Sequence, residues 1–122
     1  NALIVSPFPK RQTLTRQTPI IRNRLIAALA EAVIVGEASL GSGTHHCTSF
    51  ARELRVPIFF LPDGAEADSQ LASVHRELQR NGAVPFTADE ALDPAFAERI
   101  LAAAARHRQR RDKEEKAQLR LF

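Results

Sequence analysis

The chain has 122 residues, 44% of them hydrophobic and 25% charged, with a net charge of +3 and a single cysteine. This length and apolar content fit one globular domain or part of one. One cysteine excludes an internal disulfide framework, and no apolar run approaches the roughly 20 residues that cross a bilayer. We therefore expect a cytoplasmic protein that does not interact with a membrane. Residues 1–30 contain lysine and arginine but no carboxylate, which is compatible with a polyanion contact or with an ordinary solvated surface.

The first third of the chain predicts a strand, a helix and a second strand. Residues 2–6 are an apolar, β-branched run closed by prolines, which predicts a buried strand. Because the chain opens directly on this strand, we expect it to continue a longer protein. Thr18 and Pro19 are typical of a helix start, and this helix should extend to Ala30. Residues 32–35 predict a second buried strand.

The middle of the chain repeats the alternation of strand and helix. A glycine-rich turn at residues 41–43 precedes a helix that Thr44 should cap and that ends near Leu54. Residues 57–61 predict a third buried strand. A further helix is expected from about Asp68 to Arg80, stopped by Asn81 and Gly82.

A short fourth strand at residues 83–86 precedes the last helix, which should start at Asp93 and Pro94. Its apolar positions are Phe96, Ile100, Leu101 and Ala104. After Ala105 the sequence is polar.

This alternation predicts an α/β protein with a mainly parallel sheet of about four strands, covered by helices on both faces. The expected architecture is a Rossmann-like three-layer α/β/α half domain over residues 1–92. Residues 93–117 should form a charged helix or tether, and residues 118–122 a terminal peptide motif.

Arg22, Asn23 and Arg24 form the first candidate site, early in the first predicted helix. Helix N-termini offer unpaired N–H groups, and arginine binds phosphate through two parallel hydrogen bonds. The alternative is a solvated polar face on an apolar helix, which the spacing alone favours.

Ser42, Gly43 and Thr44 form the second candidate site, between a strand end and a helix. Ligands of open α/β sheets bind outside the carboxyl ends of the strands, and glycine lets the main chain approach a phosphate. The segment matches neither the Walker loop nor the dinucleotide fingerprint. An ordinary tight turn explains it equally well.

Histidines and the cysteine do not form a recognisable metal or nucleophile set. His45 and His46 are adjacent on a helix and point in different directions, and Cys47 has no evident catalytic partner. His75 and His107 are isolated, and we expect them at the surface. We assign no catalytic residue, metal or cofactor.

The last five residues are apolar again after a long charged stretch. Leu119, Leu121 and Phe122 either fold back on the chain's own core, pair in a dimer, or anchor a recognition peptide in a partner's pocket.

Several segments together resemble the second half of the Rossmann-like domain of the DNA-processing protein A (DprA/Smf) family. The similar segments are residues 3–9, 22–26, 32–38, 42–44 and 57–62. The resemblance implies single-stranded DNA binding, transfer to the RecA recombinase, and a homodimer. The chain departs from the family at three places. Pro19 and Ile20 stand where the family usually has Phe-Pro, and His45, His46 and Cys47 stand where it usually has a leucine-containing segment. The family's preceding glycine- and arginine-rich half is absent. That half is either supplied by another segment or chain, or lacking.

The family resemblance implies a DNA or phosphate groove that runs along Arg22, Asn23 and Arg24. The Ser42–Thr44 helix start supplies hydroxyl and main-chain donors. Softer phosphate contacts are expected from Lys10, Arg11 and Arg16.

The terminal peptide resembles the short motif by which bacterial replication and repair proteins bind the DNA polymerase sliding clamp. The matching residues are Gln118, Leu119, Leu121 and Phe122. The resemblance implies that the sliding clamp is a partner.

The leading interpretation is therefore a non-enzymatic single-stranded DNA-binding protein of recombination, repair or DNA uptake. The alternative is a nucleotide-binding or nucleotide-cleaving domain related to the lysine decarboxylase-like phosphoribohydrolases, with Glu37 near the ribose or phosphate. The Pro-Gly-Gly-x-Gly-Thr motif of those enzymes is missing.

Overall fold

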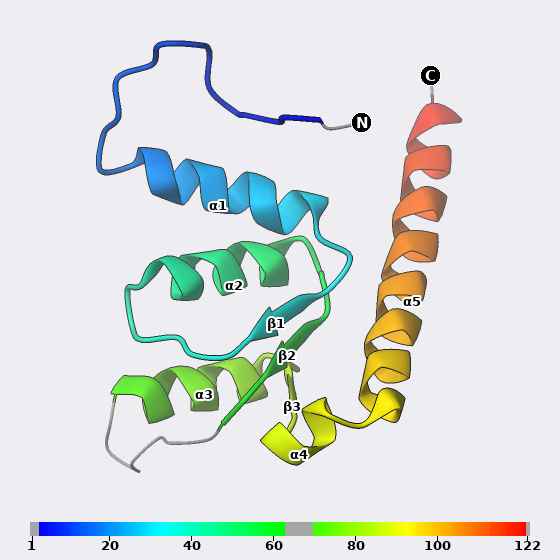
Figure 1. The fold of residues 1–122 in the computed structure, drawn as a ribbon. Coiled ribbons are helices and arrows are strands. Elements are labelled where there is room, and N and C mark those ends of the chain that lie inside the picture. The colour runs from blue at the N-terminus through cyan, green and yellow to red at the C-terminus, as the bar shows by residue number, and fades with distance from the viewer. Residues whose placement is uncertain (1–2, 63–69, 122) are drawn as a thin grey trace.

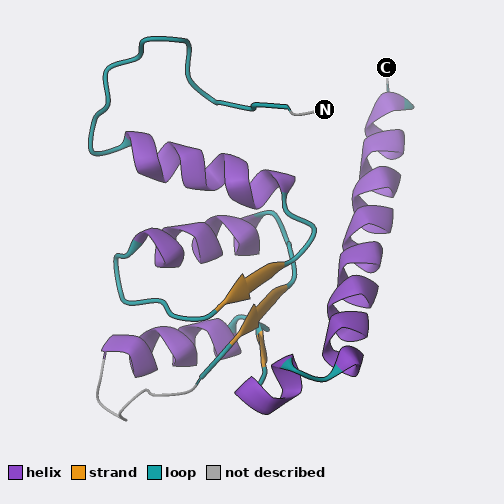
Figure 2. Cartoon of the chain, viewed as in Figure 1, coloured by secondary structure: helices purple, strands orange, loops and turns teal. Residues whose placement is uncertain are grey.

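The computed structural model describes residues 3–62 and 70–121. Figure 1 shows the course of the chain and Figure 2 its helices and strands. In chain order the elements are α1 (Thr18–Leu29), β1 (Val33–Val35), α2 (Gly43–Glu53), β2 (Ile58–Phe60), α3 (Gln70–Arg80), β3 (Val84–Pro85), α4 (Ala88–Ala91) and α5 (Pro94–Leu119). Ala2, Asp68 and Phe122, which belong to predicted segments, lie outside the described residues.

The three strands form a parallel sheet in the order β1-β2-β3. Ile34 pairs with Phe59, and Phe59 pairs with Val84, so these side chains share one face. The helices α2 and α3 cross over on the other face, and α1 packs on α2. The predicted α/β class, the parallel sheet and the three-layer arrangement are confirmed.

Two separate cores hold these layers together. On the α2 and α3 face, Val35, Phe60 and Val74 are the largest fully buried side chains. On the opposite face, Phe96 of α5 contacts Phe59 and Phe86, with ring centroids 5.9 Å and 4.6 Å apart. This second cluster attaches α5 to the sheet.

Most helix ends follow the local sequence. Asp93 caps α5 by accepting the Ala95 N–H, and Pro94 occupies its first turn. Gly82 has the positive φ of 83° expected where α3 stops. The cap of α2 differs from the prediction, because Ser42 rather than Thr44 accepts the His45 N–H. The helix therefore begins at Gly43, two residues earlier than a Thr44 cap predicts.

The predicted first strand is wrong over the described residues 3–6. Leu3 and Ile4 are 86% and 93% exposed and pair with nothing in the described chain. A short apolar run becomes a strand only where a sheet edge receives it. The sheet therefore has three strands over the described residues, not about four, and the outer edge of β1 is open.

Burial also differs from prediction at four other positions. Ile34 in the predicted buried strand is 55% exposed, and Leu101 in the predicted apolar face of the last helix is 68% exposed. His75 and His107, expected at the surface, are both buried. His75 packs against the Phe60 ring, and His107 lies at the contact of α5 with the α2–β2 loop.

Among the described residues, no helix combines the length and apolar character needed to cross a membrane.

Candidate functional site

A groove of about 530 Å³ runs between α1, the start of α2 and the open edge of β1. Four of the predicted phosphate-binding residues line it: Arg22, Asn23, Gly43 and Thr44. Residues 20 positions apart in sequence are thus brought to one surface. The groove lies beside the carboxyl end of β1 and the N-terminus of α2, where open α/β sheets bind ligands.

Asn23 fixes the geometry of this groove. Its side chain is buried, and Nδ2 donates a 3.0 Å hydrogen bond to the main-chain oxygen of Gly43. Arg22 Nη2 donates to Asn23 Oδ1 at 3.4 Å. Asn23 therefore joins α1 to the start of α2 and orients the Arg22 guanidinium. Both polar atoms of its side-chain amide already have hydrogen-bond partners.

The start of α2 presents main-chain donors to the groove. Gly41 adopts a positive φ of 73°, which turns the chain into the helix. Ser42 caps the His45 N–H and does not line the groove. The first N–H groups of a helix have no intrahelical acceptor, and those of Gly43 and Thr44 are available to an anion at the positive end of the helix dipole.

The structure separates the other predicted basic residues from this groove. Arg24 projects from α1 over the Phe50 ring, at 5.8 Å from its centroid. Lys10, Arg11 and Arg16 are exposed on the segment before α1. That segment and α1 enclose a second cavity of about 330 Å³, which shares Arg22 with the groove.

Apolar residues that the sequence did not single out also line the groove. Ile26 and Ile34 are about half exposed there, at 49% and 55%. No sequence motif indicated them, because Ile26 lies inside the first predicted helix and Ile34 inside the predicted buried strand at residues 32–35. Cys47 also lines the groove, and burial raises the pKa of its thiol, which keeps it protonated.

The neighbouring histidines have structural partners. His45 Nδ1 accepts the Gly41 N–H at 3.2 Å, and its Nε2 lies 3.2 Å from Glu77 Oε2. His45 thus links the turn before α2 to α3. In the part of the chain that the structure describes, no three His, Cys, Asp or Glu side chains are placed to hold a metal ion.

The described residues of the terminal peptide, 118–121, are all exposed. Gln118 and Leu119 end α5, and Leu119 and Leu121 are 69% and 84% exposed. Neither leucine folds back onto the core. Figure 1 shows this end of α5 extending beyond the sheet.

Residues 1–95, which include α1, the groove and all three strands, match the family model described as DNA recombination-mediator protein A. The chain belongs to the DNA recombination-mediator protein A family. The predicted resemblance to DNA-processing protein A is thereby confirmed, while nearly all of α5 lies beyond the matched residues.

Two relatives in this family come from Mycobacterium tuberculosis, strains CDC 1551 / Oshkosh and ATCC 25618 / H37Rv. Each carries the name "Putative DNA processing protein DprA" and is 29% identical over 93 residues. The alignment covers 76% of this chain and 24% of each relative, so the matched part spans about a quarter of their length. No solved structure matches the chain.

Proposed function

We propose that the groove between α1, α2 and β1 binds single-stranded DNA, as part of a recombination mediator. The observation that supports this most is the meeting of Arg22 and the free N-terminus of α2 in one groove, at the 3.0 Å contact of Asn23 with Gly43. The family match extends over all of these residues.

In this proposal Arg22 and the N–H groups of Gly43 and Thr44 hold a phosphate. Lys10, Arg11 and Arg16 add weaker, salt-sensitive contacts from the preceding segment. The half-exposed Ile26 and Ile34 give unstacked bases an apolar surface along β1. Arg24, placed over Phe50, has no contact with the DNA.

Fluorescence anisotropy with a labelled single-stranded oligonucleotide at two salt concentrations tests the proposal. Affinity should fall as salt rises, because phosphate contacts release counterions. Arg22→Ala should weaken binding, and Arg24→Ala, which removes the same charge two residues away, should weaken it much less. Equal losses in the two variants, or no binding by the folded chain at low salt, would contradict the proposed site.

The nucleotide-cleaving alternative is not favoured by the family match. Glu37 is exposed and does not line the groove. The RecA recombinase and a homodimer stay predictions from the family resemblance.

A second candidate function is the presentation of the terminal peptide to the DNA polymerase sliding clamp. It is favoured by the exposure of Leu119 and Leu121 at the free end of α5. Calorimetric titration of the whole chain with a bacterial sliding clamp should detect binding that Leu121→Ala/Phe122→Ala abolishes. The matched change Leu92→Ala/Leu101→Ala, at two exposed leucines elsewhere, should leave it intact.

A further inference from the structure

A second groove lies at the opposite edge of the sheet, where β2 and β3 begin and α2 and α3 end. It consists of two adjoining cavities of about 290 Å³ and 380 Å³ that share Pro57, Ile58 and Gly82. One cavity extends toward α2 and the other toward α5. Among the described residues, its lining has no member in common with the groove that contains Arg22.

Arginines border this second groove on both sides. Arg52 and Arg55 line it at the end of α2, and Arg99 and Arg106 line it from one face of α5. Over the described parts of the chain, no Asp or Glu lines either cavity. The side chains that line the groove are thus basic or uncharged, and the carboxylates that pair with them lie outside it.

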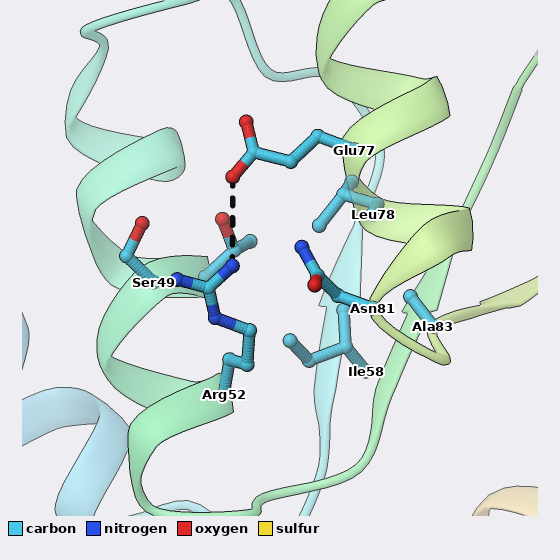
Figure 3. Close-up of a pocket in the computed structure, with 8 residues that line it drawn as sticks. Ser49, Arg52, Ile58, Glu77, Leu78, Asn81 and Ala83 are labelled. Atoms are coloured by element: carbon cyan, nitrogen blue, oxygen red, sulfur yellow. Dashed lines mark ion pairs between the residues drawn. The ribbon is translucent and has the colours of Figure 1, made fainter.

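Three of these four arginines already form exposed ion pairs, and in the shortest of them Arg99 Nη1 lies 3.2 Å from Glu90 Oε1. Arg106 makes no ion pair with any described residue. Arg52 Nη1 lies 3.7 Å from Glu77 Oε1, and Figure 3 shows this pair in an adjoining pocket that Ile58 and Asn81 also line. Arg55 Nη1 lies 3.6 Å from Glu114 Oε1, with both side chains more than half exposed. Exposed pairs of this kind contribute little and are readily exchanged for another anion.

The positive charge here comes from side chains alone. The C-terminal ends of α2 and α3 direct carbonyl groups toward this edge, the negative end of each helix dipole. The carbonyl of Arg55, in the loop that follows α2, accepts a 2.6 Å hydrogen bond from Arg110 Nη2. An anion bound here would therefore depend on the arginines, whereas the first groove also offers main-chain donors.

Apart from the arginines and Asn81, the groove is lined mainly by apolar residues. Pro57, Ala102 and Ala103 contribute to it, together with Val84, which is 37% exposed at the open edge of β3. Such a lining suits flat, uncharged groups that alternate with anionic ones, and arginine guanidinium planes also stack on bases.

We propose that this groove binds the phosphodiester backbone of a second segment of single-stranded nucleic acid. The arginines contact phosphates, and the apolar lining receives bases. The α5 wall of the groove, with Arg99 and Arg106, lies beyond the residues that the family model matches. The second groove and the groove that contains Arg22 would therefore bind the same class of ligand, but they share no lining residue among those described.

The test compares Arg52→Ala/Arg106→Ala with the control Arg80→Ala/Arg111→Ala. The control removes the same charge from exposed positions on α3 and α5 that line neither cavity. Binding of a long labelled single strand is measured against salt concentration by anisotropy. Losing two phosphate contacts should lower the slope of log affinity against log salt by about 1.4, at about 0.7 per contact. The control should change it far less, and circular dichroism verifies folding.

The same pair of changes in an Arg22→Ala background separates this inference from the proposed function. Residual binding of Arg22→Ala that the Arg52→Ala/Arg106→Ala change removes supports a second site. If Arg22→Ala has no effect while Arg52→Ala/Arg106→Ala lowers the slope, the first site is wrong and the second stands. Equal slopes for the groove variant and its control overturn the second site. Competition by polyglutamate as strong as by the oligonucleotide overturns nucleic acid as its ligand.

Discussion

The amide of Asn23 in α1 donates to the carbonyl of Gly43, the first residue of α2, across 3.0 Å. One turn further along α1, Ala27 is fully buried in the core that α1 and α2 share. An added Cβ at Gly43 would stand 3.5 Å from Asn23 Nδ2, an ordinary contact distance. A buried hydrogen bond therefore joins these helices in addition to their apolar contacts.

Replacing Asn23 by alanine should lower the free energy of unfolding by about 1–3 kcal/mol, because a buried hydrogen bond and its packing are lost. Since the chain has no Trp or Tyr, urea denaturation is followed by far-ultraviolet circular dichroism. Gln79→Ala, at an exposed position of α3, should change stability by less than about 0.5 kcal/mol. Similar effects of the two variants would show that the Asn23 contact is not important for stability.

Phe96 attaches α5 to the sheet, so Phe96→Ala should be among the most damaging single changes. Its ring is 6% exposed and contacts both Phe59 and Phe86. Truncating a buried phenylalanine costs about 3–5 kcal/mol. Limited proteolysis should then cleave α5 faster. Leu101→Ala on the same helix, at a 68% exposed position, should have little effect, and comparable cleavage of both variants would rule out this attachment.

The pair Arg108–Glu31 should make the docking of α5 sensitive to acid. Arg108 Nε and Nη2 donate to the two Glu31 oxygens at 2.7 Å and 2.6 Å. The hydrogen bond from Arg108 lowers the pKa of Glu31 below its ordinary value of 4.5. A lowered carboxyl pKa stabilises the fold above the unfolded-state value, and that contribution is lost as the pH falls through the folded-state value.

Glu31→Gln should consequently be less stable than the parent chain at pH 7 and equally stable near pH 2. Denaturation in urea at a series of pH values measures this difference. The control Glu98→Gln changes an exposed carboxylate on α5 for which the structure gives no ion pair among the described residues. A stability difference for Glu31→Gln that does not narrow in acid would contradict the role of the ion pair.

Local signals in the sequence predicted much of this fold. Pro19 and Pro94 mark helix starts, Gly82 marks a helix stop, and residues 57–61 contain a buried strand, because each depends on neighbouring residues alone. The family resemblance rests on short segments that follow one another in the expected order. It could also be predicted from the sequence, and it is confirmed.

The predictions that were wrong concern features that depend on contacts between residues far apart in the sequence. Leu3 and Ile4 are apolar enough for a strand, but no sheet edge receives them. In α1 the apolar Leu29 is exposed while the polar Asn23 is buried, because the buried face of α1 is the one that packs on α2. The sequence also gave no indication that Arg52 and Arg106, more than fifty positions apart, border one groove.

The burial of His75, which the sequence did not predict, can also be tested. Its Nε2 is buried without a hydrogen-bond partner among the described residues, beside the Phe60 ring at 5.4 Å. Burial lowers the pKa of this imidazole below 6.5. Because the unfolded chain then binds a proton more readily than the folded one, His75 makes the protein less stable as the pH falls through about 6.5.

His75→Leu should thus raise the free energy of unfolding by about 1 kcal/mol at pH 8, since a buried, unsatisfied polar atom costs about 1–3 kcal/mol. The advantage over the parent chain should grow between pH 8 and pH 5.5, where the parent must keep His75 neutral to stay folded. Urea denaturation at both pH values measures it, with Gln79→Leu as an exposed, uncharged control on the same helix. If His75→Leu is destabilising at both pH values by the same amount, the imidazole has a partner and its burial carries no penalty.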